Sequence, residues 1–217
     1  MAARTAVDRS SGVSVIFDNK VGGIRADDAE TRKLLREYSI KRGDIVTSDG
    51  VTLATSRDTG GRLRYKREYP QGDLFAHLTG FYSIVYGKSR IEASYDDELL
   101  GDSGVLSMQD IEDRLFDSGE QGEDVVLTIN SELQQIAREG LGNQRGAVVA
   151  LDPTTGEIKA MWSNPSYDPG PLAAHNTRRE RRHYESLDPS SPRSPLVAIS
   201  TSFGYPPGST FKVVTLA

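Results

Sequence analysis

Gly146-Ala-Val-Val-Ala-Leu-Asp-Pro-Thr-Thr-Gly-Glu-Ile158 is the stretch that decides the fold. Apolar runs at 147–151 and 158–162 flank the segment Asp-Pro-Thr-Thr-Gly-Glu, which is rich in turn-forming residues. This arrangement predicts an antiparallel hairpin with a longer turn. Just before it, residues 131–141 predict a helix that carries Leu133, Ile136 and Leu141. Because helices and strands are mixed along the chain, and its character changes near residue 144, we expect an α+β fold.

The sequence before the hairpin predicts a series of shorter elements. A capping pair, Asp27 and Glu30, begins a helix that extends to Ser39. Residues 45–55 indicate a hairpin, in which Asp49-Gly50 predicts a type I′ turn because both central positions of that turn have positive φ. The other expected elements are strands at 63–69, 81–86 and 125–129, and helices at about 90–100 and 107–116.

The sequence after the hairpin has little periodicity. Residues 164–195 are rich in Pro, Ser, Asp and Arg, and they predict a loop with a short basic helix around 176–186. Pro206-Pro207-Gly208 then predicts a stop, after which Ser209 to Ala217 begins a helix. A helix of about nine residues is marginal by itself. We therefore expect the chain to be truncated soon after this helix begins.

Composition limits the functions to consider. The formal net charge is −5 and the isoelectric point is near 5.3, so we expect no nucleic-acid partner. The absence of cysteine excludes disulfides and thiolate chemistry. No apolar run approaches the ~20 residues needed to cross a bilayer, so we expect the polypeptide as it stands to be soluble. His77, His175 and His183 lack the spacing of a metal-binding helix, and we expect no metal or cofactor.

Several other polar residues have simple structural interpretations. Solvated helix faces or loops explain the basic cluster Arg178, Arg179, Arg181 and Arg182 and the acidic stretch Asp96, Asp97, Glu98, Asp110, Glu112 and Asp113. Asp49, Asp152 and Asp168 are typical of turns, and Trp162 of a core.

Ser209-Thr210-Phe211-Lys212 is the candidate catalytic segment. If Ser209 begins a helix, Lys212 lies on the same face and within reach of the hydroxyl. A desolvated lysine can act as the base that a serine nucleophile needs, and a helix N-terminus favours developing negative charge. The bare pattern also fits a helix N-cap serine with an exposed lysine, and it occurs by chance about once in a chain of this length.

The surrounding sequence resembles the class B penicillin-binding proteins. Tyr205-Pro-Pro-Gly-Ser-Thr-Phe-Lys-Val213 is similar to their active-site segment, the stretch from Gly146 to their first transpeptidase hairpin, and Pro165-Ser-Tyr-Asp-Pro169 to the loop after it. Matches to their pedestal module follow the family's order: Arg42-Gly-Asp-Ile, Asp49-Gly, Tyr69-Pro, Gly80-Phe-Tyr-Ser, Tyr86-Gly, Ile91-Glu and Leu127-Thr-Ile-Asn. The resemblance covers about residues 20–217 and is strongest for actinobacterial members with a short pedestal.

The resemblance implies a domain organisation and an activity. It implies a non-matching extension at 1–20, a pedestal or dimerisation-type domain at 21–144, and a truncated transpeptidase domain of the serine beta-lactamase type at 145–217. It further implies an anchored enzyme at the extracytoplasmic face of the plasma membrane that cross-links peptidoglycan at the D-Ala-D-Ala ends of stem peptides. Ser209 would be the acylated nucleophile and Lys212 its base, and beta-lactams would acylate the same serine. Because Arg-Gly recurs in the pedestal of this family, the resemblance also implies that Arg42 makes a buried charged contact there, with a partner that the sequence does not name.

Three departures limit this carry-over. The later S-x-N and K-T-G motifs of the family would lie beyond Ala217, Met1 to Lys20 does not resemble the membrane anchor, and Leu196-Val197-Ala198 replaces a common Asn-Arg-Ala. We therefore expect the chain alone to be inactive and not to react with penicillin. One alternative is a non-catalytic pedestal module that binds divisome or elongasome proteins. Another is a serine beta-lactamase or beta-lactam sensor, against which the pedestal motifs argue.

Overall fold

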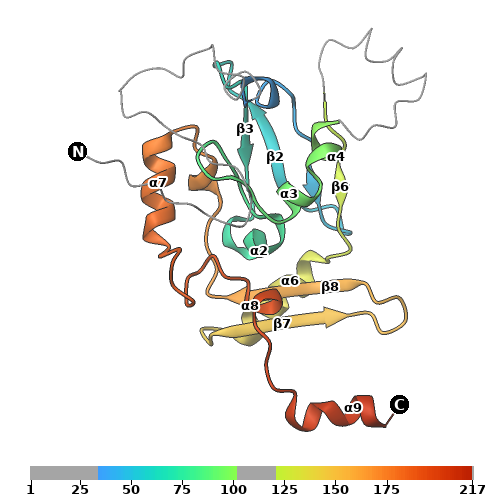
Figure 1. Cartoon of the computed structure of the whole chain (residues 1–217). Coiled ribbons are helices and arrows are strands. Elements are labelled where there is room, and N and C mark those ends of the chain that lie inside the picture. The colour runs from blue at the N-terminus through green and yellow to red at the C-terminus, as the bar shows by residue number, and fades with distance from the viewer. Residues whose placement is uncertain (1–33, 102–120, 217) are drawn as a thin grey trace.

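The computed structural model describes residues 34–101 and 121–216. Within these ranges it confirms an α+β fold, with a four-stranded sheet and short helices above a two-stranded hairpin (Figure 1). The expected extension at 1–20, the first part of the helix at 27–39 and the expected helix at 107–116 lie outside the described residues. Residues 34–37 are helical, as expected. No helix in the described ranges has the length and apolar character required to span a bilayer.

The pedestal, by which we mean residues 34–101 and 121–130, is built on a sheet with strand order β3-β2-β1-β6. Its strands are β1 (Ile45–Val46), β2 (Thr52–Asp58), β3 (Tyr65–Glu68) and β6 (Val125–Val126). β2 is antiparallel to both of its neighbours, whereas β6 runs parallel to β1. Apolar side chains of this sheet pack with Phe75 and Leu99 from neighbouring helices to form the main core.

The β1–β2 turn differs in type from the one predicted. Of the pair Asp49-Gly50, only Gly50 has a positive φ, at 81°. Thr47 N–H donates to the Val51 carbonyl and Gly50 N–H donates to the Thr47 carbonyl, both at 3.0 Å, so a longer connection that ends in a positive-φ glycine replaces the type I′ turn. The Asp49 carboxylate accepts the Ser131 N–H at 3.0 Å. A tertiary contact therefore engages the residue that the local pattern assigned to the turn.

Residues 72–100 form shorter elements than predicted. The expected strand at 81–86 is β4 (Tyr82–Ser83), after which the chain turns back to form β5 (Gly87–Lys88). The expected helix at 90–100 is divided at Tyr95 into α3 (Ile91–Ser94) and α4 (Asp96–Leu100). Before them come η1 (Gly72–Phe75) and α2 (Ala76–Thr79), which the sequence analysis did not predict. Helices this short gain too few internal hydrogen bonds to form without packing contacts.

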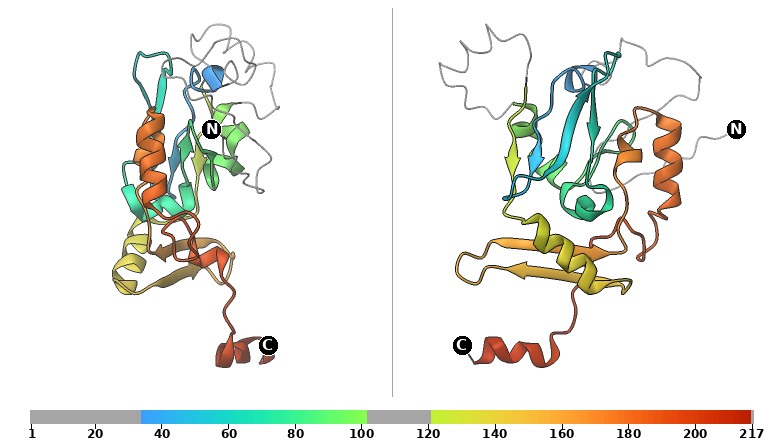
Figure 2. Two further views of the ribbon diagram at one scale, coloured as in Figure 1. Left: turned by 60° about the vertical axis from the view of Figure 1, so that its left-hand side comes forward. Right: turned by 180° about the vertical axis from the view of Figure 1, so that it is seen from behind.

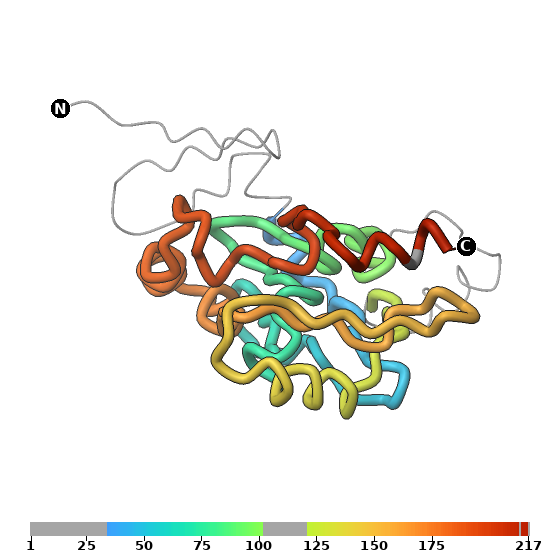
Figure 3. The backbone as a smooth tube through the Cα atoms, turned by 90° about the horizontal axis from the view of Figure 1, so that it is seen from below, coloured from blue at the N-terminus to red at the C-terminus, as the bar shows by residue number. Residues whose placement is uncertain are grey.

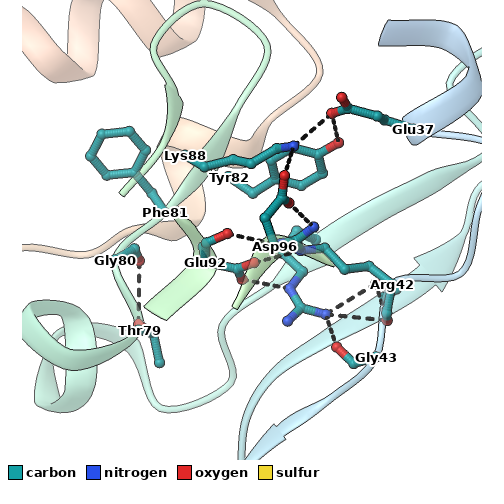
Figure 4. A network of polar contacts seen from close by, with 12 residues as sticks. Glu37, Arg42, Gly43, Thr79, Gly80, Phe81, Tyr82, Lys88, Glu92 and Asp96 are labelled. Atoms are coloured by element: carbon teal, nitrogen blue, oxygen red, sulfur yellow. Dashed lines mark hydrogen bonds and ion pairs between the residues drawn. The ribbon is translucent and has the colours of Figure 1, made fainter. Parts of the chain in front are cut away.

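A buried ion-pair network joins these helices to the sheet (Figure 4). Arg42 Nε lies 2.7 Å from one oxygen of Glu92, Arg67 Nε lies 2.7 Å from the other, and Arg42 Nη1 lies 2.6 Å from Asp96. Burial acts to raise the pKa of Glu92, but the two guanidinium groups outweigh it and the pKa is lowered. The buried charged contact expected of Arg42 is thus confirmed. Asp96, expected on a solvated face, instead pairs with Arg42 and Lys88.

The predicted hairpin is confirmed as β7 (Gly146–Leu151) and β8 (Ile158–Asn164). Helix α6 (Ser131–Leu141), also predicted, packs on one face of it, where Ala137, Ala160 and Trp162 form a small core. The helix begins after Asn130, whose side-chain oxygen accepts the Leu133 N–H at 3.0 Å. Two of the three apolar residues predicted along α6, Leu133 and Ile136, are 41% and 55% exposed.

The two faces of β7 have different surroundings. Val148 and Ala150 pack in the core beneath α6, whereas Val149 and Leu151 are 45% and 59% exposed. The view from below shows α6 on one side of the hairpin and the C-terminal segment on the other (Figure 3). The outward face of β7 is therefore apolar and largely uncovered.

Residues 164–198, which we call the strap, return from the hairpin to the pedestal. The strap contains η2 (Gly170–Ala173) and α7 (Thr177–Ser186), which confirms the predicted short basic helix. α7 lies beside the pedestal in both views of Figure 2. Tyr167 and Leu172 pack with Ala76 and Phe81 in a buried cluster. The strap thus completes part of the pedestal core.

After α8 (Ile199–Ser202) the chain leaves the body as an arm, residues 203–216 (Figure 1). The arm contains η3 (Gly208–Phe211) and α9 (Lys212–Thr215). The helix predicted after Pro206-Pro207-Gly208 is confirmed, and its first turn is of the tighter 3-10 type.

Candidate functional site

Ser209 and Lys212 lie one turn apart at the start of the helical part of the arm. Gly208 has a φ of 53°, a conformation that glycine adopts readily, and the chain turns there into η3. The Lys212 N–H donates to the carbonyls of Ser209 and Thr210. Because residues three apart are eclipsed in a 3-10 turn, the two side chains leave the helix on the same side. This is the relation that the sequence pattern predicted.

The surroundings of these two residues are open. Ser209 and Lys212 are both exposed, and among the described residues neither Ser209 Oγ nor Lys212 Nζ has a hydrogen-bond or ion-pair partner. The apolar side chains next to them are open as well, with Phe211 53% exposed and Leu216 86% exposed. A serine hydroxyl becomes a good nucleophile only when a base removes its proton, and a lysine becomes a base only when burial or nearby charge lowers its pKa. Ser209 and Lys212 therefore have the expected spacing, but no described side chains enclose them.

A groove of about 450 Å³ lies where the arm leaves the body, between the outward face of β7 and α8. Its lining residues are Arg145, Gly146, Ala147, Val149, Ile199, Ser200, Phe203 and Tyr205. The lining is mostly apolar, and the Arg145 guanidinium lies 5.5 Å from the centre of the Phe203 ring. The groove can accept apolar groups, and it is bordered by the first residues of the arm.

Two hydrogen-bonded anchors hold the chain just before the arm. The Ser200 N–H donates to Ser163 Oγ on β8 at 3.1 Å, and the two hydroxyl oxygens are also 3.1 Å apart. The Pro195 carbonyl lies 2.8 Å from Nε2 of His77 on α2. Between these anchors Ala198 and Ile199 are buried. The path from the body to Ser209 therefore starts from a fixed position.

The three histidines have separate structural surroundings. His183 contacts the Asp168 carbonyl at 3.1 Å, and His175 packs edge-on against Tyr38 at 5.0 Å. The described residues contain no group of three His, Cys, Asp or Glu side chains suited to hold a metal ion. His77 is buried against the strap, a contact that no local sequence signal indicates.

The remaining sequence candidates have the structural roles expected of them. Asp152 accepts the Thr154 N–H at 2.8 Å and Asp168 accepts the Gly170 N–H at 2.9 Å, as turn residues do. Trp162 is buried in the hairpin core. The four arginines of α7 are exposed, as expected of a solvated face.

Glu180, in the middle of the arginine cluster, is a buried residue that the sequence analysis missed. Its carboxylate accepts the Ser83 hydroxyl at 2.6 Å, which attaches α7 to the end of β4. Burial raises the pKa of Glu180. A glutamate flanked by arginines has the sequence pattern of a solvated helix, so only the tertiary structure distinguishes it.

Comparison with known families gives two matches. Residues 42–125 match the family described as "Penicillin binding protein A dimerisation domain", and residues 146–217 match "Penicillin binding protein transpeptidase domain". The first match ends in β6 and the second begins at the first residue of β7, so α6 lies between them.

Curated and solved relatives agree with these matches. The peptidoglycan D,D-transpeptidases PbpA of Mycobacterium tuberculosis and Mycolicibacterium smegmatis are 42% and 43% identical over 200 residues, covering 90% of this chain and 40% of each relative. The structure of penicillin-binding protein A from M. tuberculosis as an imipenem acyl-enzyme complex has a TM-score of 0.74 at 40% identity, covering 84% of this chain and 42% of that one. The corresponding penicillin G acyl-enzyme complex has a TM-score of 0.72 at 39% identity, covering 82% and 42%. The chain spans about 40% of the length of the curated relatives it matches.

Proposed function

Because this chain belongs to the penicillin-binding protein family, with its dimerisation domain and the start of its transpeptidase domain, we propose that it supplies the pedestal and the nucleophile of a peptidoglycan D,D-transpeptidase. Ser209 is the nucleophile and Lys212 the general base. The observation that carries the proposal is the placement of this pair one turn apart, directly after Pro206-Pro207-Gly208 and inside the transpeptidase match. Residues 21–144 form the pedestal domain and residues 145–217 the transpeptidase part.

The proposed reaction has two acyl-transfer steps. Ser209 Oγ attacks the carbonyl carbon of the D-Ala-D-Ala peptide bond while Lys212 takes the hydroxyl proton. The tetrahedral intermediate collapses, the bond to the terminal D-Ala breaks, and D-Ala leaves with a proton. The amine of a neighbouring stem peptide then attacks the acyl-serine, which forms the cross-link and frees Ser209. The substrate places this chemistry at the extracytoplasmic face of the plasma membrane, and beta-lactams acylate the same hydroxyl.

The open surroundings of the pair set the condition under which it reacts. Lys212 and Ser209 are both exposed, and no described residue contacts Lys212 Nζ or orients Ser209 Oγ. Removing one positioned base from a proton transfer typically costs about 10²–10⁴-fold in rate. We therefore expect no acylation of the 217-residue chain, and rapid acylation only where the transpeptidase domain is complete.

Intact-mass spectrometry after incubation with penicillin G tests this proposal. The gene product carrying both domains in full should gain the mass of one drug molecule, and Ser209→Ala should abolish the gain. Ser202→Ala is the matched control, because Ser202 is also an exposed serine and lies at the end of α8, seven residues before Ser209. Lys212→Met should slow acylation by about 10²-fold or more. Labelling that persists in Ser209→Ala would refute the assignment of the nucleophile.

A second candidate function is binding of divisome or elongasome proteins by the pedestal. It is favoured by the pedestal's own hydrophobic core and by its separate family match at 42–125. The bait for a pull-down should be the whole 217-residue chain, because the strap covers Ala76 and Phe81 of the pedestal. Failure of this bait to retain any cell-wall synthesis protein that the full gene product retains would refute the binding function.

A further inference from the structure

Helix α2 and the turn η1 before it form the junction between the pedestal and the chain that leads to Ser209. The Asp73 carboxylate accepts two hydrogen bonds from Arg138, at 3.0 and 3.1 Å. The Asp73 carbonyl accepts the Ser166 hydroxyl at 2.7 Å, and the Ala76 carbonyl accepts the Tyr167 hydroxyl at 3.4 Å. A short stretch of the pedestal is thus held by α6 on one side and by the strap on the other.

His77 contacts the strap at Pro195, farther along the chain toward the arm than Ser166 and Tyr167. Its side chain is 6% exposed, and its ring packs edge-on against Tyr167 at 5.7 Å. A carbonyl oxygen can only accept, so Nε2 carries the proton that is donated to Pro195. Nδ1 is buried without a partner among the described residues. Burial lowers the pKa of His77, which keeps the ring neutral and leaves it a single hydrogen bond to the strap.

The backbone of Pro195 can form a hydrogen bond only through its carbonyl, because proline has no N–H to donate. The N–H groups of Leu196 and Val197 donate within the segment, to the hydroxyl and the carbonyl of Ser194. The bond from His77 therefore holds the chain five residues before Ser200, and Arg90 Nη1 also lies 3.5 Å from Thr201 Oγ1 in α8. Ser163 provides the second anchor at Ser200.

We propose that His77 is a positioning residue for Ser209, because its hydrogen bond to the Pro195 carbonyl fixes the direction in which the arm leaves the body. The inference rests on the proposed role of Ser209 as nucleophile. A pedestal side chain thereby acts on the reaction without touching the substrate. A purely structural role for His77 leads to a different expectation, namely lost stability with no specific effect on Ser209.

Three variants separate these roles in the gene product with a complete transpeptidase domain. His77→Phe keeps the ring and removes the donor, whereas His77→Gln places an amide N–H close to the position of Nε2. Tyr69→Phe is the matched control, because it also removes one buried hydrogen bond, from the Tyr69 hydroxyl to Glu92 at 3.1 Å, but the acceptor belongs to the pedestal and not to the strap. All three should lower the melting temperature, so stability alone does not distinguish them.

The first measurement is the rate constant of Ser209 acylation by a fluorescent penicillin, separated from its binding constant. His77→Phe should reduce this rate constant roughly fivefold, the change expected from one lost buried hydrogen bond, and His77→Gln should restore it. Tyr69→Phe should leave it unchanged at a similar melting temperature. Equal rate constants in His77→Phe and Tyr69→Phe would overturn the proposal.

The second measurement is hydrogen exchange of the amides at 200–202 in the same proteins. His77→Phe should accelerate their exchange roughly fivefold, while Tyr69→Phe should not. If the wild-type protein is not acylated, the proposed function fails, and exchange still tests the anchor. Unchanged exchange in His77→Phe would then overturn the positioning role.

Discussion

Glu92→Gln is the substitution that tests the buried network of the pedestal most directly. One carboxylate oxygen of Glu92 accepts Arg67 Nε and the other accepts Arg42 Nε, both at 2.7 Å. An amide retains the shape, but it removes the negative charge and turns an N–H₂ donor toward one of the two guanidinium groups. Because the side chains of Arg42 and Arg67 are only 2% and 1% exposed, water cannot replace the lost partner.

The expected loss is large compared with the stability of a domain. Leaving a buried charge without its partner costs about 3–5 kcal/mol. A domain has about 5–15 kcal/mol of unfolding free energy in total. For a chain of this size each kcal/mol changes the melting temperature by about 2–4 °C, so a loss of about 4 kcal/mol lowers it by about 8–16 °C.

Urea unfolding at pH 7, followed by the fluorescence of the single tryptophan and by circular dichroism, measures this loss. Glu68→Gln is the control, because Glu68 also pairs with an arginine, Arg57, at 2.6 Å, but the two side chains are 35% and 57% exposed. An exposed pair is worth about 0–1 kcal/mol. The reasoning is refuted if Glu92→Gln destabilises the protein no more than Glu68→Gln does.

Three further perturbations have clear expected outcomes. Burial lowers the pKa of His175 from 6.5 to about 4, so acidification through this range protonates the unfolded chain first and reduces the unfolding free energy. His175→Asn, which suits the positive φ of 54°, should diminish that reduction in urea titrations. An unchanged pH dependence of the unfolding free energy would contradict the argument. Gly140→Ala in α6 adds a methyl group that meets no atom within 4 Å, so it should raise the unfolding free energy by about 0.5–1 kcal/mol. Gly80→Ala, with a φ of 74° and the Ser89 carbonyl in the way, should lower the unfolding free energy by several times that amount. Equal effects of the two variants in thermal melts would be inconsistent with the backbone geometry. Leu151 on the outward face of β7 is 59% exposed, so Leu151→Lys should reduce concentration-dependent light scattering and change the unfolding free energy by less than about 0.5 kcal/mol. A marked drop in melting temperature would contradict this expectation and indicate that Leu151 is packed.

The elements that the sequence predicted well are those with a long local pattern. α6, α7 and the β7–β8 hairpin each carry enough residues for their period, caps and turn residues to agree. The short elements between Gly72 and Leu100 carry too few residues for a pattern, and contacts from distant parts of the chain set their limits. The β1–β2 turn was predicted wrongly for a related reason, because Asp49 bonds to a residue in α6 that lies far along the chain.

The spacing of the candidate pair was predictable from the sequence, whereas its surroundings were not. Ser209 and Lys212 were selected from their spacing of three residues and from the resemblance of the segment around them, both of which a sequence displays directly. Arg42 was expected to be buried with a charged partner, but its partner Glu92 lies 50 residues away, and no spacing rule connects them. His77 and Glu180 were missed because their burial depends on the strap folding back onto the pedestal.

The return of the strap to the pedestal sets an order of events during synthesis. Ala76 and Phe81 leave the ribosome long before Tyr167 and Leu172, the residues that cover them. At about 5–20 residues per second, the roughly 90 residues between these groups take some 5–20 seconds to make. During that interval the nascent pedestal presents an incomplete apolar surface, which is the kind of surface that chaperones bind. The strap must therefore be synthesised before the pedestal can finish folding.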